Sequence, residues 1–178
     1  MKTIKTLCIA VLAIFLFSNA ACDKKIKFEK SIDGASVTFT ALPQASGPYD
    51  FSENVKFDLE TQLKQYDVTL AQVTQVTAES VTIAIEDASA TPITFDIVDF
   101  VNLELGSTAI TSKRVAFKDP VPHTGLILIS PDMDPAFDVL PLAKGNDIIY
   151  HFTGKLNTAL DHQVKMKVTI KWKITAEI

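Results

Sequence analysis

The chain has 178 residues, with 17 Lys and Arg against 21 Asp and Glu, so its formal charge is −4. Arg114 is the single arginine, and an acidic chain without a basic patch interleaved with aromatic residues argues against a nucleic-acid partner. Both cysteines, Cys8 and Cys22, fall within the first 22 residues, so the rest of the chain holds neither a disulfide nor a thiolate metal ligand.

Residues 1–21 have the features of an export signal. Lys2 and Lys5 give a positive start, residues 7–17 are uninterruptedly apolar, and small residues follow. Eleven helical residues rise about 16 Å, whereas the hydrocarbon core of a bilayer is about 30 Å thick. The segment is therefore a removable leader rather than a membrane span.

Cys22 directly follows Ala20 and Ala21, as at a lipoprotein processing site. Signal cleavage after Ala20 also fits the small-x-small rule, and it leaves Cys22 as an unpaired thiol. We favour cleavage before Cys22 because that cysteine then carries the acyl chains. The expectation is a protein anchored in the cell envelope, at the outer membrane, with the leaflet left open between a periplasmic and a surface-exposed position. Residues 22–178 hold 15 basic and 21 acidic residues, a charge of −6.

Residues 22–34 are polar and rich in lysine, which predicts the acylated cysteine followed by a short tether with some strand in it. Residues 35–178 form one domain. Apolar and polar residues alternate with period two over 37–39, 55–59, 81–85 and 101–105, a pattern typical of half-buried strands.

Two short helices are predicted between the strands. Asp58 caps one that carries Leu59, Leu63 and Tyr66 on a single side. Asp134 followed by Pro135 resembles a cap with proline at the first helical position. That second helix is expected to bury Phe137 and Leu140.

The apolar run 125–129 predicts a central strand that is buried on both faces. Residues 164–174 alternate without a break, with Val, Met, Ile and Trp on one side and Lys and Thr on the other, and predict a long strand. The strand expected over 147–156 precedes it across a loop at 157–163. The two are predicted to pair as an antiparallel hairpin.

These elements predict an all-β antiparallel sandwich of about eight strands with one or two short helices. A closed β-barrel is the second choice.

The pattern resembles small Bacteroidetes-type envelope lipoproteins. It consists of a Leu-bearing helical piece at 59–66, a Val-rich strand at 79–85, a Phe-containing segment at 94–105 and a final Val/Lys/Thr strand at 164–174. The charged residues 23–25 after the cysteine fit the same resemblance. Functions in that group are mostly unassigned, so the resemblance implies only the fold and the envelope location.

No catalytic or metal site is predicted. His123, His151 and His162 have no second ligand at a metal-binding offset and are expected to be surface residues. The acidic run 132–138 lacks the third ligand and the turn glycine of a calcium loop, so capping is favoured there. No cofactor is expected.

Lys165, Lys167, Lys171 and Lys173 lie on one side of the final strand. Such a row suits an anionic ligand, such as phosphate headgroups or an acidic polysaccharide. The favoured interpretation is a solvated face whose lysines discourage edge-to-edge pairing.

Two function classes follow from these patterns. The first is a non-catalytic, lipid-anchored module that binds an envelope protein or a glycan, and the absence of a catalytic constellation favours it. The alternative is a small-ligand carrier or an envelope enzyme built on a barrel, which predicts a cavity of a few hundred Å³. The oligomeric state stays open.

Overall fold

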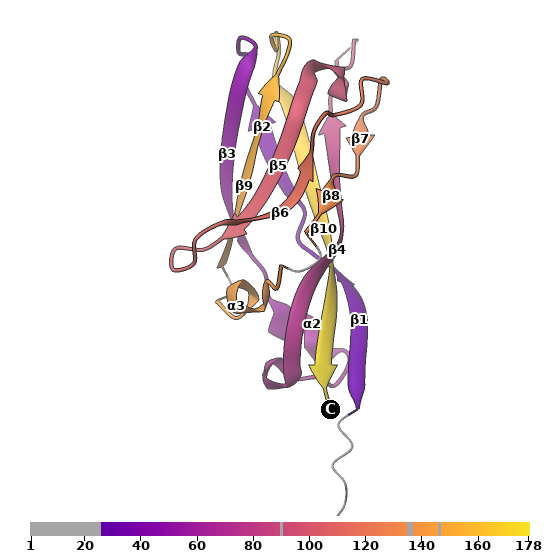
Figure 1. Cartoon of the computed structure of the whole chain (residues 1–178), viewed down its shortest axis with the longest axis vertical. Helices are drawn as coiled ribbons and strands as arrows, with labels where there is room; N and C mark the ends of the chain where they lie inside the picture. The colour runs from indigo at the N-terminus through magenta and orange to yellow at the C-terminus, as the bar shows by residue number, and fades with distance from the viewer. Residues whose placement is uncertain (1–25, 90, 135–136, 146) are drawn as a thin grey trace, which may run out of the picture.

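A computed structural model of the chain describes residues 26–89, 91–134, 137–145 and 147–178. The predicted leader at 1–21, Cys22 and the first residues of the predicted tether lie outside the described residues. Two five-stranded antiparallel sheets pack face to face as separate layers (Figure 1). The predicted antiparallel sandwich is confirmed, and across the described residues the two sheets do not close into the β-barrel that was the second choice.

The first sheet is built around the long strand β10. Its order is β1 (Lys27–Asp33), β10 (Val164–Glu177), β4 (Val73–Glu86) and β7 (Leu128–Ile129), and β2 (Val37–Ala41) also pairs with β10. The second sheet has the order β3 (Gly47–Lys56), β9 (Asp147–Leu156), β5 (Val98–Gly106), β6 (Lys113–Lys118) and β8 (Asp132–Met133). β1 occupies residues 27–33, within the segment 22–34 that was expected to contain some strand.

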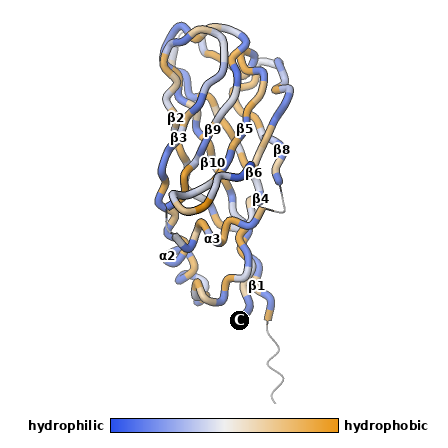
Figure 2. The backbone as a smooth tube through the Cα atoms, turned by 60° about the vertical axis from the view of Figure 1, so that its left-hand side comes forward, coloured by the Kyte–Doolittle hydropathy of each residue, from blue (hydrophilic) through white to orange (hydrophobic). Residues whose placement is uncertain are grey.

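The core lies between the two sheets and follows the alternation in the sequence. All six apolar residues predicted on the inner side of β10, including Trp172, are buried. The tube in Figure 2 changes repeatedly between hydrophobic and hydrophilic colours along the strands, as this alternation requires. Phe152 of β9 stacks on Phe39 of β2 across the core, with ring centroids 5.4 Å apart, and lies 5.5 Å from Tyr49 of β3.

Two helices and two 3-10 turns join the strands. Helix α2 (Leu59–Lys64) begins at Asp58, whose Oδ1 accepts a hydrogen bond from the Thr61 backbone N–H at 2.9 Å, so the predicted cap is confirmed. The 3-10 turns are η1 (Leu70–Gln72) and η2 (Phe95–Ile97).

Helix α3 (Leu140–Ala143) begins later in the chain than predicted. Asp138, rather than Asp134, accepts from the Leu140 backbone N–H at 3.0 Å, and the same oxygen accepts from Val76 N–H on β4 at 2.9 Å. The predicted start at Asp134 is therefore too early: the N-cap residue is Val139, which makes no side-chain capping bond, and Asp138 instead links the helix start to β4. Leu140 is buried as predicted, and Phe137 is partly buried.

The predicted hairpin of residues 147–156 and 164–174 is wrong. β9 pairs with β3 and β5 in the second sheet, whereas β10 pairs with β1, β2 and β4 in the first. Residues 157–163 cross from one layer to the other, and Leu160 holds this crossing by two backbone hydrogen bonds to Gln44. Crossing buries Leu160 and lets the apolar sides of both strands face each other across the core.

The apolar run 125–129 is also not a central strand. β7 pairs only two residues with the edge of β4, and Leu126, Ile127 and Leu128 are 42%, 55% and 51% exposed. Only Ile129 is buried in the core. A strand at a sheet edge with no layer over its outer side leaves such residues in solvent.

Both ends of the described chain lie at the same end of the molecule (Figure 1). Ile26 and Ile178 exchange backbone hydrogen bonds of 2.8 and 3.0 Å, and their side chains are 64% and 46% exposed. Leu42 directly follows β2, which pairs with the first residues of β10, at the end of that strand away from Ile178. The thirteen steps along β10 from Val164 to Glu177 place the two ends of this strand about 43 Å apart.

Candidate functional site on the outer face of the second sheet

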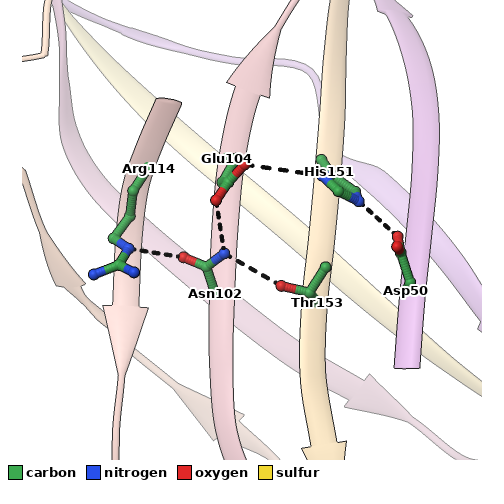
Figure 3. A network of polar contacts seen from close by, with 6 residues as sticks. All are labelled: Asp50, Asn102, Glu104, Arg114, His151 and Thr153. Atoms are coloured by element: carbon green, nitrogen blue, oxygen red, sulfur yellow. Dashed lines mark hydrogen bonds and ion pairs between the residues drawn. The ribbon is translucent and has the colours of Figure 1, made fainter. Parts of the chain in front are cut away.

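A connected set of polar side chains lies on the outer face of the second sheet (Figure 3). It spans four neighbouring strands: Asp50 comes from β3, His151 and Thr153 from β9, Asn102 and Glu104 from β5, and Arg114 from β6. Alternation places these side chains outward because their neighbours, such as Phe152 and Leu103, point into the core. No helix or strand lies in front of this part of the sheet in Figure 1.

Asn102 is the centre of the network. Its Nδ2 donates to Glu104 Oε1 at 3.1 Å and to Thr153 Oγ1 at 3.2 Å, and its Oδ1 accepts from Arg114 Nε at 3.0 Å. Asn102 is 9% exposed. Three hydrogen bonds therefore fix the orientation of this amide and, through it, the side chains around it.

His151 lies between two carboxylates. Its Nε2 is 2.6 Å from Asp50 Oδ1, and its Nδ1 is 3.9 Å from Glu104 Oε2. The network holds one guanidinium, two carboxylates and one imidazole, so charges of both signs lie side by side.

Arg114 is held by stacking as well as by hydrogen bonding. Its guanidinium carbon lies 4.6 Å from the ring centroid of Phe117, and the Phe117 and Phe100 centroids are 6.3 Å apart. Both rings are half-buried. Arg114 uses its Nε to hydrogen-bond Asn102, and the residue as a whole is exposed, so its guanidinium is accessible from solvent.

This arrangement presents donors and acceptors at fixed positions beside apolar rings, a combination suited to recognition of a polar ligand. Ion pairs on such an exposed surface contribute only about 0–1 kcal/mol to stability. The network of six polar side chains therefore adds little to the stability of the fold, and this favours a role in binding.

The predicted lysine row lies on the opposite sheet and is interleaved with glutamates. Lys167 is 3.8 Å from Glu86, Lys171 is 3.6 Å from Glu79, and Lys173 is 3.1 Å from Glu29. Hydrogen bonds from Lys27 and Lys173 lower the pKa of Glu29. Lys165 lies opposite Glu86 in the strand register. Since carboxylates alternate with these lysines, we propose no anionic ligand for the row.

His162 joins the crossing at 157–163 to the loop after β4. Its Nε2 is 2.9 Å from Asp87 Oδ2, and its Nδ1 is 2.5 Å from Asp161 Oδ1. Asp87 is 3% exposed and also accepts from the backbone N–H groups of Ile93 and Ser89. These two bonds, followed by the one from His162, lower the pKa of Asp87. The hydrogen bonds to Asp87 and then to Asp161 raise the pKa of His162.

Both ring nitrogens of His162 thus face carboxylates, and the charged imidazolium is the favoured state. Its pKa is raised in the folded state, so its stabilisation is fully present below the unfolded pKa of about 6.5 and is lost as the pH rises through the folded value.

Replacing His162 with Gln is expected to remove this pH dependence. The melting temperature of the unmodified protein should exceed that of the variant at about pH 5, and the difference should shrink above about pH 6.5. Thermal melts followed by circular dichroism measure it, with His123→Gln in an exposed loop as the control. A constant difference across the pH range contradicts the ion-pair account.

The remaining acidic run contains no metal centre in the described part of the chain. Asp132 contacts Lys118 at 3.4 Å, and Asp138 accepts from the backbone N–H groups of Leu140 and Val76. No group of three His, Cys, Asp or Glu residues has a metal-holding arrangement among the described residues.

The space between the two sheets is closely packed. An apolar void near Ala41 and Leu160 measures about 10 Å³, which is no more than the space of a single water. Two open clefts lie elsewhere, one of about 460 Å³ beside Asp87 and one of about 550 Å³ between α2 and β1. In the described residues, no helix has the length and apolar composition needed to cross a membrane.

Comparison with known proteins adds no functional assignment. No protein-family model matches the chain, and no curated protein matches it. Among solved structures, it is similar to a chain of turnip yellow mosaic virus, with 8% identity and a TM-score of 0.26, over 87% of this chain and 96% of the viral one. A likeness this loose supports no conclusion about function.

Of the outer-face residues, only His151 was singled out from the sequence. Its neighbours come from strands that are distant in the chain, so their proximity depends on the order β3-β9-β5-β6. Arg114 did carry a signal, because it is the single arginine of the chain.

Proposed function

We propose that this protein is a lipid-anchored, non-catalytic binding module of the cell envelope, held at the outer membrane by acyl chains on Cys22. Its ligand binds to the outer face of the second sheet. The observation that carries the binding role is the network centred on Asn102, in which fixed polar groups lie beside the half-buried rings of Phe100 and Phe117.

The position of the chain ends supports the anchoring. Cys22 precedes Ile26 by four residues, so an acylated cysteine lies within about 14 Å of chain from that end of the sandwich. Ile26 and Ile178 would rest on the bilayer there, and the long axis would stand away from it. The binding face, which runs along the side of the sandwich, is then open to the surroundings.

A tryptophan placed at residue 178 tests this orientation. The full, acylated chain with Ile178→Trp is reconstituted in vesicles that contain brominated lipids. The new tryptophan should be quenched, whereas the native Trp172 is buried in the core and adds a constant background.

Leu42→Trp is the matched control, since Leu42 is 63% exposed and lies at the far end of β10. Equal quenching at both positions contradicts the upright orientation. Failure of the acylated chain to sediment with the vesicles contradicts the anchoring itself.

A further inference from the structure

We infer that the ligand of the outer face is a neutral glycan, bound across β3, β9, β5 and β6 by the network centred on Asn102; this rests on the proposed binding function. The inference starts from the chemistry that the face offers. A sugar presents hydroxyl groups that both donate and accept hydrogen bonds, together with apolar C–H surfaces. A site for it therefore needs donors, acceptors and apolar area side by side.

The polar half of that requirement is present in one row. The exposed guanidinium of Arg114 supplies donors, and Asp50 and Glu104 supply carboxylate oxygens that accept from hydroxyls. Asp50 is 68% exposed, so the oxygen that does not contact His151 is open to solvent. Hydrogen bonds with a charged partner are the stronger kind, which suits a ligand that has no charge of its own.

The apolar half lies beside this row. Phe117 pairs with Asn102 in the strand register, and Phe100 lies next to it with a ring tilt of 44°. Lys155, which pairs with Asp99 at 2.8 Å, borders Phe100 on the other side. Arg114 covers one face of Phe117, so Phe100 and the exposed part of Phe117 offer the apolar area against which the C–H surface of a sugar can pack.

The network is ordered before any ligand arrives. Arg114 is clamped between the Phe117 ring and the Asn102 amide, and Asn102 is itself held by Glu104 and Thr153. A side chain that is already fixed loses little conformational entropy on binding. The guanidinium of an arginine such as Arg114 is weakly hydrated and planar, so it can bind a ligand through directional hydrogen bonds as well as through its charge.

Charge and size narrow the ligand class. Asp50 and Glu104 carry two negative charges against the one positive charge of Arg114, so this network does not favour a polyanion. Four strands give three spacings of about 4.8 Å, a row of about 14 Å, which suits a short stretch of a chain of sugars rather than a single ring.

A glycan microarray with neutral and uronic-acid-bearing oligosaccharides tests the inference, probed with the full chain in detergent so that the result does not depend on anchoring. We expect binding to a neutral class. Arg114→Ala and Asp50→Ala should each weaken it by about tenfold or more, because each removes a charged hydrogen-bond partner. Both positions are exposed, and melting temperatures should confirm that the two variants are folded.

The control combines Lys165→Gln, Lys167→Gln, Lys171→Gln and Lys173→Gln on the opposite sheet, and it should bind the neutral glycan as the parent does. Three results overturn the inference: no neutral glycan is bound, only acidic glycans are bound and the lysine variant loses them, or Arg114→Ala binds unchanged. A protein partner that competes at Arg114 in the absence of glycan binding would overturn the ligand class and leave the binding module standing.

Discussion

Replacing Cys22 with alanine is expected to abolish fatty-acid labelling of the protein and to release it from the membrane. A lipoprotein carries its acyl chains on this one residue, and each buried methylene contributes about 0.8 kcal/mol to membrane binding. Two or three chains make spontaneous release rare, and their loss leaves a domain with a net acidic charge. Labelling with radioactive palmitate and cell fractionation measure both effects.

Cys8→Ala is the matched control, since it removes the only other thiol of the chain and lies within the leader. It should leave both the labelling and the membrane location unchanged. A Cys22→Ala protein that still sediments with the membrane would contradict the anchoring.

Replacing Phe152 with alanine is expected to lower the free energy of unfolding by about 3–5 kcal/mol. The ring is completely buried between the sheets, where it lies against Phe39 and Tyr49, so its removal leaves a cavity in the core. Chemical denaturation followed by the fluorescence of Trp172, which is buried in the core, measures the change.

Thr153→Ala is the matched control one residue away on the same strand. Its side chain faces outward and accepts one hydrogen bond from Asn102, so its loss should cost no more than about 1 kcal/mol. A Phe152→Ala protein as stable as the Thr153 variant would show that the two sheets do not pack through this aromatic cluster.

Elements with strong local signals were predictable from the sequence. The alternation in residues 164–174 defined both the strand and its buried side, and Asp58 marked the start of α2. In both cases the signal lies within one turn or one strand. The antiparallel sandwich followed because many short alternating segments with polar turns have few other ways to bury one side.

Elements whose structure depends on distant neighbours were not predictable. β9 and β10 separate into different sheets because each finds its partners elsewhere in the chain, and the connecting residues 157–163 are compatible with either outcome. Residues 125–129 are apolar enough for a central strand, but only the sheet order, in which β7 lies last beside β4, determines that β7 is an edge strand.

The candidate site depends on the same long-range order. Asp50 and His151 are 101 residues apart in sequence, and Asn102 and Thr153 are 51 apart. Each residue alone resembles an ordinary polar position on a strand. Only the pairing of β3 with β9 and of β9 with β5 brings them into one network.

Mass spectrometry of the amino-terminal peptide, from the full chain expressed in bacteria, tests the central claim most directly. The account predicts a mature chain that begins at Cys22 and carries the added mass of its acyl chains. An unmodified chain that begins at Ala21 would contradict it.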